Sequence, residues 1–494
     1  MEYGRGGGGG LPVFRGARMQ RGYGLGSMLK GLLRSAIPIV KSGGKLLGKK
    51  AWQTGLNVVR DVANGKSLAS ATTSNLKKLG QQFTSNSSGR VKKKVKRKRP
   101  KKDPVRSTEE YTDLSQTLIH LQVKVVNGDG TPLAEDAQVG PTNMFLHSLF
   151  SDVDLMLNDR LITPSTNTYA YRAALETLLT YGPEAKESQL TSALFYKDTP
   201  GHMDDGNPLR EDAGNMGLKE RHRFIKGSKT VDMVGLLHLD MVFQDKLLLG
   251  GVDIKLKLNR SKNSFSLMSS VQNAEYKVII TSASLHVRRV KLSPETSLLH
   301  AKTLETQTAK YPIRRSEVKT FSIPRGNLSF TRESLILGQM PKRLVIGCVS
   351  NTAFNGNYAK NPFNFHHYDL NFLALYADSE QIPWKPIRPN FSAPDPNYIL
   401  AYQTLFSGIN SMFHDKGNQI TRTDYDKGYT LYAFDMTPDL STGDCFNLRK
   451  HGNVRLEMQF ARELPETVNV MVYAEYESVI EIDRNRNVII DFGG

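Results

Sequence analysis

The 494-residue sequence contains only two cysteines, Cys348 and Cys445. So few cysteines exclude a disulfide framework, and we expect two free thiols in a reducing compartment. No stretch reaches the roughly 18 uncharged apolar residues of a membrane-spanning helix. The glycine- and arginine-rich start also lacks the apolar segment of a secretory signal. We therefore expect neither a membrane span nor a secreted, disulfide-held protein.

Catalytic motifs are also missing from the sequence. It has no Walker A loop, no H-E-x-x-H, no G-x-S-x-G and no cysteine spacing typical of zinc sites. His366 and His367 precede an expected core strand, which favours a structural role over metal binding. The carboxylates at 203–206 and 211–212 could bind a divalent cation, but a solvated turn is the favoured interpretation. We therefore expect no enzyme, no cofactor and no metal, and we interpret residues 483–486 as a turn or an intersubunit ion pair.

The positive charge is unevenly distributed along the chain. The net charge is +18, and residues 1–107 contain 25 lysines and arginines against 3 acidic residues. The remaining residues therefore carry a net charge of −4. A strongly basic arm on a mildly acidic body indicates a polyanionic partner, either nucleic acid or an anionic membrane.

The first part of the arm predicts disorder followed by a helix. Residues 1–23 are rich in glycine and arginine and are expected to be disordered. From about 25 to 40, apolar residues recur every three or four positions, which predicts an amphipathic helix. Such a helix outside a globular domain is typical of a membrane interface, and the alternative is packing on the protein's own body. The residues expected to contact a membrane are Met28, Leu29, Leu32, Leu33 and Ile37.

The second part of the arm, residues 91–102, contains nine cations and no acidic residue. It resembles a nuclear-localisation signal, and the same charges would neutralise DNA phosphates without reading sequence. The alternative interpretation is a solvated tether. The residues expected to bind nucleic acid are Lys92, Lys93, Lys94, Lys96, Arg97, Lys98, Arg99, Lys101 and Lys102.

The C-terminal region shows the period-two alternation of half-buried strands. Val454, Leu456, Met458 and Phe460 alternate with polar residues, and a second alternation runs from 468 to 476. We predict two strands, each with one buried face, joined by a turn at 464–466. Further strands are expected at 118–125, 153–157, 237–243, 252–258, 276–292, 312–323, 343–348, 367–376 and 429–435.

Four features recur in the same order about 190–230 residues apart. Segments 143–164, 176–182, 237–243 and 252–292 are followed by counterparts at 361–383, 403–408, 429–435 and 453–476. Repeats of this size predict a duplicated domain rather than a solenoid. Segments 176–182 and 403–408 are predicted to be helical, the first in a helix that Thr166 caps and Gly182-Pro183 ends. Segments 185–230 and 383–428 are predicted as long loops, so the body is interpreted as two all-β sandwiches or barrels.

Residues 109–492 contain several short sequence motifs that together resemble one known family. These are Glu110–Leu114, Phe145–Phe150, Gln189–Asp198, Lys310–Arg315, Asn361–Phe365, Glu463–Asn469 and Glu481–Val488. They are similar to the double jelly-roll major capsid protein of Polinton/Maverick elements and adintovirus-like viruses. In that family a strand-bearing segment precedes the motif that matches Glu110–Leu114, and this segment is absent here. The arm from Gly22 to Leu47 resembles the small core proteins of adenovirus-like genomes.

The resemblance implies an all-β fold of two tandem jelly rolls with helix-bearing loops. The expected organisation is a basic arm over 1–107, a first jelly roll over 108–300 and a second over 301–494. It also implies homotrimeric, pseudo-hexameric capsomers that contact neighbouring capsomers, penton and minor capsid proteins and packaged double-stranded DNA. The expected locations are the virion capsid and, during assembly, the host nucleus. The alternatives are a minor capsid or membrane-active protein, or a non-specific nucleic-acid-binding protein that uses the β body for oligomerisation.

Overall fold

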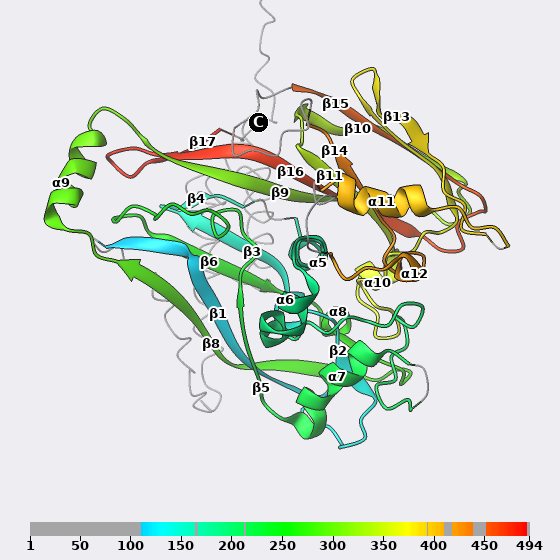
Figure 1. Ribbon diagram of the computed structural model, residues 1–494. Helices are drawn as coiled ribbons and strands as arrows, with labels where there is room; N and C mark the ends of the chain where they lie inside the picture. Colours follow the sequence, from blue (N-terminus) through cyan, green and yellow to red (C-terminus); the bar gives the residue numbers. More distant parts are fainter. Residues whose placement is uncertain are drawn as a thin grey trace, which may run out of the picture. The chain divides into compact units, whose positions relative to one another are not determined.

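The computed structural model describes residues 110–163, 166–211, 214–392, 394–409, 417–437 and 451–491. Strands dominate this part of the chain, and helices lie in the connections between them (Figure 1). The predicted helix at 25–40 and the basic run at 91–102 lie outside the described residues, as does Cys445.

The first half contains two antiparallel three-stranded sheets and a short strand pair. One sheet has the order β5(Val231–Leu236), β1(Tyr111–Asn127) and β8(Tyr276–Val290). The other has the order β4(Arg160–Leu161), β3(Phe150–Leu157) and β6(Ile254–Arg260). The short pair consists of β2(Val139–Pro141) and β7(Leu267–Ser269).

The second half contains two larger antiparallel sheets. One has the order β10(Ser329–Gln339), β15(His451–Phe460), β12(Leu370–Ala377) and β13(Glu380–Ile387). The other has the order β14(Leu431–Asp435), β11(Arg343–Ser350) and β16(Val468–Ile482), and both β9(Ala309–Ile323) and β17(Val488–Ile490) pair with β16.

Helices occupy the connections between these strands. Those in the first half are α4(Phe145–Ser148), α5(Tyr169–Thr180), α6(Pro183–Glu187), η1(Gln189–Ala193), α7(Met216–Ile225), η2(Lys226–Ser228) and α8(Asn263–Ser266). The helix α9(Pro294–Thr303) joins the halves, and α10(Asn351–Phe354), α11(Ile399–Ser407) and α12(Arg422–Tyr425) follow. Helix α5 contacts both β3 and β9, so it packs against strands of both halves.

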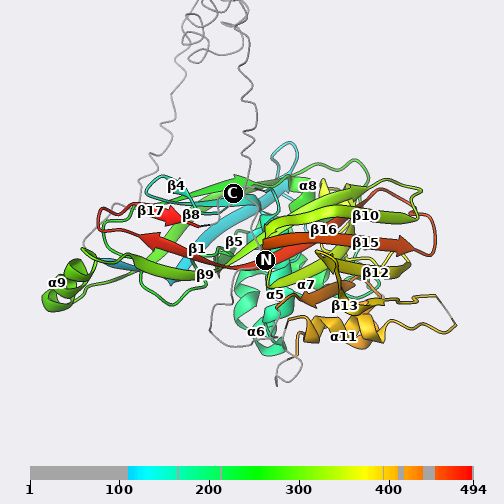
Figure 2. The ribbon, with the colours of Figure 1, turned by 90° about the horizontal axis from the view of Figure 1, so that it is seen from above.

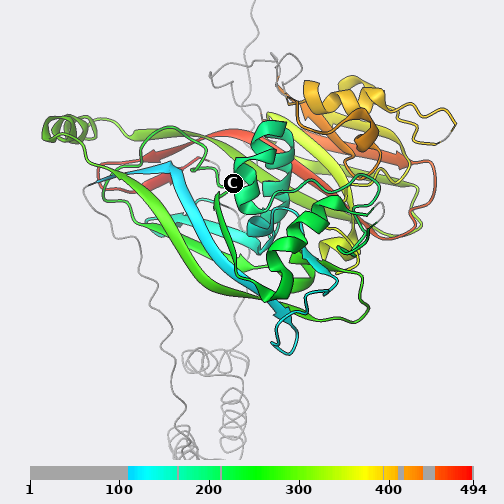
Figure 3. The same ribbon diagram turned by 60° about the horizontal axis from the view of Figure 1, so that its bottom comes forward.

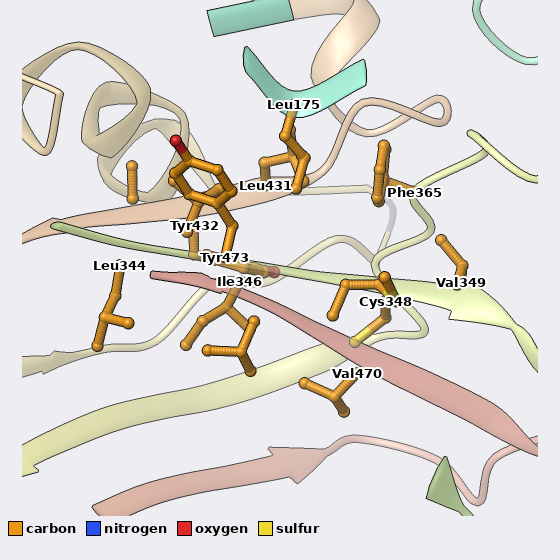
Figure 4. Packing of buried hydrophobic residues seen from close by; sticks show 14 of the residues in the cluster. Leu175, Leu344, Ile346, Cys348, Val349, Phe365, Leu431, Tyr432, Val470 and Tyr473 are labelled. Carbon is orange, nitrogen blue, oxygen red and sulfur yellow. The ribbon is translucent and has the colours of Figure 1, made fainter. Parts of the chain in front are cut away.

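The described residues form two hydrophobic clusters that cross the boundary between the halves. Leu175 and Leu178 of α5 belong to the cluster of the second half, and Figure 4 shows Leu175 beside Leu431 of β14. Conversely, Ile313 of β9 and Ile480 of β16 belong to the cluster of the first half. Each half therefore contributes apolar side chains to the other's core.

The predicted alternation is confirmed in one terminal strand and is only partly right in the other. Along β15 the side chains of Val454, Leu456, Met458 and Phe460 are buried as predicted. Along β16 every residue from 468 to 474 is buried, so both faces of this central strand are covered. The 464–466 segment connects the two strands, but they belong to different sheets.

The prediction of a strand at 237–243 is wrong. The strand β5 ends at Leu236, and the following backbone forms local turns, in which Leu239 donates to the Leu237 carbonyl. Leu237, Leu239 and Met241 are buried as alternation requires, but His238 and Asp240 between them are buried as well. Their side chains bind polar groups on α5, so the segment covers a helix instead of joining a sheet.

Several predicted boundaries also differ from the structure. The residue before α5 is Thr168 rather than Thr166, and Pro183 begins α6. The loop predicted at 185–230 contains α7, and the loop predicted at 383–428 contains the end of β13 in addition to α11 and α12. The strand predicted from His367 begins only at Leu370, because Tyr368 and Asp369 adopt left-handed backbone angles that end an extended strand.

Candidate functional site

The most extensive polar cluster that we find in the described residues is a buried junction between the two halves. Arg172 on α5 places Nη2 2.7 Å from Asp240 Oδ1 and donates through Nε to Glu176 at 2.8 Å. His238 Nδ1 lies 2.6 Å from the other oxygen of Glu176. From the second half, the Ser316 amide donates to Asp240, and the Tyr473 hydroxyl lies 2.9 Å from the Ser316 hydroxyl.

Burial and pairing compete at this junction. Burial would raise the pKa of Glu176, but Arg172 and His238 outweigh it and lower that pKa to about 2. Burial raises the pKa of Asp240 despite the attraction of Arg172. Burial also lowers the pKa of His147 well below its usual value of 6.5, and the neighbouring His238 adds to this effect. The two imidazole rings lie 4.8 Å apart.

A second buried ion pair lies within the 196–221 connection and is hydrogen-bonded to the second half. Arg221 Nη2 donates to Asp198 Oδ1 at 2.6 Å, and neither side chain is exposed by more than 1%. The side-chain amide of Asn361 donates to the other Asp198 carboxylate oxygen at 2.9 Å. The Tyr429 hydroxyl donates to the Asp198 carbonyl at 2.7 Å. Removing either Arg221 or Asp198 would leave a buried charge without compensation.

The cavities beside these networks are small. One, of about 30 Å³, is lined by Thr163, Thr168, Arg172, His238 and Ser316 among others, and it has room for about two water molecules. Another, of about 190 Å³, is lined by the rings of Tyr171, Phe265 and Phe354 together with Lys262 and Asn355. The charged groups of the junction bind one another, and Asp240 also binds Ser316 of the second half. These contacts hold α5 between the two halves.

No known family profile matches the sequence. An uncharacterized protein of Caenorhabditis elegans is 27% identical over 397 residues, covering 77% of this chain and 90% of that protein. A chain in the cryo-EM structure of the Sputnik virophage has a TM-score of 0.51 and 10% identity, covering 78% of this chain and 84% of that chain. The fold is a double jelly roll. The mavirus major capsid protein has a TM-score of 0.45 and 11% identity, covering 79% of this chain and 85% of its own.

The residues that sequence analysis singled out as chemical candidates have protein partners in this double jelly roll. His367 stacks on Phe391 at 4.2 Å, and its Nδ1 accepts from the Asp369 amide. Asp204 lies in an exposed turn, as predicted, and accepts from the Asn361 backbone amide. Asp205 pairs with Arg210, and no group of three or more potential metal ligands occurs in the described ranges.

The remaining candidates are structural or lie elsewhere. Asp483 and Asn487 close the turn between β16 and β17, and Arg486 donates to the Gly250 carbonyl of the first half. Cys348 is a free, buried thiol whose pKa burial raises to about 12. No helix within the described residues is both long and apolar enough to cross a membrane. The predicted membrane-contacting and DNA-contacting residues, 28–37 and 92–102, lie outside the described part of the chain.

Sequence analysis missed the buried polar residues of the junction and one unusual lysine. Lys186 of α6 donates to the Leu178 and Asn418 carbonyls, and burial lowers its pKa to about 7. Arg172, Arg221 and Lys186 look like solvent-facing residues in the sequence. The buried groups that they bind, Asp240, Asp198 and the Asn418 carbonyl, lie far from them along the chain. The missed α7 did have a signal, since Asn215 caps it and Leu218, Arg221, His222 and Ile225 lie on its buried face.

Proposed function

We propose that this protein is a structural major capsid protein that builds an icosahedral shell and is not an enzyme. The observation that carries the proposal is the double jelly roll, whose halves are joined by buried hydrogen bonds and shared cores. A shell protein must transmit load between its domains without changing their relative orientation. The described interior supports this role, because Asp240 and Asp198 accept hydrogen bonds from Ser316 and Asn361 of the second half.

The proposed assembly unit is a homotrimer. Two similar domains per subunit, over 108–300 and 301–494, would give a three-fold particle a near-hexagonal outline that tiles a closed surface. Closed symmetry is the usual outcome for homo-oligomers. The proposed partners are therefore further copies of this chain, neighbouring capsomers, and the penton and minor capsid proteins that complete a shell.

The proposed role of the arm is to contact the packaged genome. Nine cations between 92 and 102 would neutralise DNA phosphates, and the same run would direct nuclear import before assembly. The helix predicted at 25–40 is proposed to contact a membrane through its apolar face. The arm's charge also supports the second candidate function, a nucleic-acid-binding or membrane-active minor capsid protein in which the β body serves only to oligomerise.

The proposed origin is a Polinton/Maverick element or an adintovirus-like virus. It is supported by the short sequence motifs between Glu110 and Val488 and by the similarity to an animal protein at 27% identity. An element integrated in animal genomes would leave relatives of this kind among animal proteins.

Sedimentation of the nuclease-treated full-length chain tests the proposed function. The major capsid protein is expected to sediment as a trimer, with larger assemblies at high concentration. A monomer at high concentration would contradict the proposal. The membrane-active alternative would be favoured if the full-length chain formed no trimer and residues 20–64 caused anionic liposomes to leak.

A further inference from the structure

The helix α9 between the halves has almost no support from its own subunit. It lies at the end of the two long strands β8 and β9, away from both sandwiches (Figures 1 and 2). None of its residues is buried, and the side chains of Leu298 and Leu299 are 72% and 64% exposed. Its contact with β1 is a hydrogen-bonding pair, the Tyr111 hydroxyl and His300 Nδ1 at 3.0 Å.

The energetics of so short a helix call for a packing partner. A ten-residue helix is marginal in water, and helices in proteins gain most of their stability from packing an apolar face. Ser293 caps α9 by accepting from the Thr296 amide, and Pro294 occupies its first turn, so the sequence specifies the helix locally. The side chains of Leu298 and Leu299, however, are left largely uncovered by the described residues of the same chain.

The strand that leads to α9 is also open. Within the described residues, β8 is an edge strand that pairs with β1 alone. Residues 281–284 are exposed on both faces of the strand, and Leu285 is only partly buried. An uncovered edge presents unpaired backbone donors and acceptors, which makes it a ready surface for another chain. Figure 3 shows the strand and α9 extending together from the first half.

Charge identifies the chemistry of the partner. Residues 279–303, which we name the β8–α9 limb, contain four lysines and arginines and one glutamate, a net charge of +3. The rest of the body from residue 108 onward carries −7. Arg288 and Lys291 pair with Asp113 and Glu110 of the same chain, at 3.9 Å and 3.6 Å. The limb as a whole stays basic, and with its two exposed leucines it is complementary to the acidic body of another copy of this chain. The leucines argue against nucleic acid as the main partner, because DNA contacts are dominated by phosphates.

We propose that the β8–α9 limb docks on a second copy of this chain, with Leu298 and Leu299 packed at the centre of the contact. Lys302 of α9 faces the acidic surface of that copy beside the centre. The limb of each subunit contacts a different surface of the next, so the contact is heterologous and closes into a ring. The inference deepens the proposed capsid function and rests on it.

The test compares the full-length chain with three nuclease-treated variants in a sedimentation dilution series. The first variant is Leu298→Asp with Leu299→Asp. Its control is Leu337→Asp on β10, where the leucine is 77% exposed. The third variant is Lys302→Glu, which keeps the leucines. Circular dichroism and thermal melting of each variant check folding, which should be preserved because all the substituted side chains are exposed.

The concentration for half-assembly is expected to rise at least about tenfold in the first variant, because charges replace buried apolar groups. The charge-reversed variant should weaken assembly in low salt and approach the parent chain in high salt, whereas the control should match the parent. Equal assembly of the parent and the leucine variant would overturn the limb's role and leave the capsid function standing. A monomeric parent would instead overturn the capsid function itself. Unchanged assembly with weakened DNA binding would show that the limb is a nucleic-acid surface and would also overturn the proposal.

Discussion

Arg172 and Asp240 form an ion pair whose carboxylate is fully withdrawn from water. Breaking such a pair from one side leaves an uncompensated buried charge, which costs about 3–5 kcal/mol. We therefore expect Arg172→Leu to lower the free energy of unfolding by about that amount, as measured by urea denaturation. The substitution would also remove the Nε donor of Glu176, which would keep only the partners it has besides Arg172, among them His238.

A matched arginine provides the control for that substitution. Arg223 on α7 pairs with Glu220 at 2.6 Å, but its side chain is 64% exposed. Exposed pairs contribute about 0–1 kcal/mol, so Arg223→Leu should leave the urea midpoint nearly unchanged. Equal losses in the two variants would mean that the junction does not depend on the buried pair.

His147 makes stability depend on pH. Burial, reinforced by His238, lowers its pKa well below 6.5, so below pH 6.5 the unfolded chain binds a proton that the folded chain does not. Stability from this group is therefore complete above pH 6.5 and is lost as the pH falls, by at most about 1.4 kcal/mol per pH unit. Urea melts between pH 7 and pH 5 measure the slope.

A second histidine serves as the control for the pH effect. The slope should become shallower in His147→Gln and stay unchanged in His286→Gln, since His286 is exposed on β8. A slope that persists without His147 would place the responsible group elsewhere.

At the scale of elements, α7 depends on close approach to the 196–198 segment. A methyl group added at Gly217 would lie 2.4 Å from the Lys197 carbonyl oxygen and 2.7 Å from that of Tyr196. Gly217→Ala should therefore push α7 outward and destabilise the fold by about 1–3 kcal/mol, as overpacking does. Thermal melting measures the loss, and Gly417→Ala is the control because no atom lies within 4 Å of the added methyl.

The same elements show how far sequence analysis could reach. Alternation located β15 correctly because one of its faces is covered and the other meets solvent. It failed for 237–243, where His238 and Asp240 are buried because their partners lie on α5, more than 60 residues away. Local periodicity records whether a residue is apolar and carries no information about a distant ionic partner. The candidate junction was therefore beyond its reach, while the absence of recognised catalytic motifs was visible at once.

At the scale of the whole molecule, the ordered repeats predicted a duplicated β body, and the double jelly roll confirms that fold class. The interlocking of the halves, in which α5 enters one core and the end of β16 enters the other, was not predicted. Exchange of side chains between cores depends on how the repeats pack, and two repeats of similar sequence can pack in many ways.

The basic run gives a prediction for the complete chain. Nine cations contacting phosphates would give a slope of log K against log salt of up to about −8, from roughly −0.9 per contact. Replacing Lys92–Lys94 and Lys96–Arg99 with glutamine should flatten this slope and leave assembly intact, as measured by DNA binding across a salt series. An unchanged slope would reduce the run to a solvated tether and shift the arm's role to the helix predicted at 25–40.

The central claim is that this double jelly roll assembles into a shell. Electron microscopy of the purified, nuclease-treated full-length chain tests it most directly. The account predicts three-fold capsomers with a near-hexagonal outline, alone or joined into closed particles. A uniform field of single subunits at high protein concentration would contradict it.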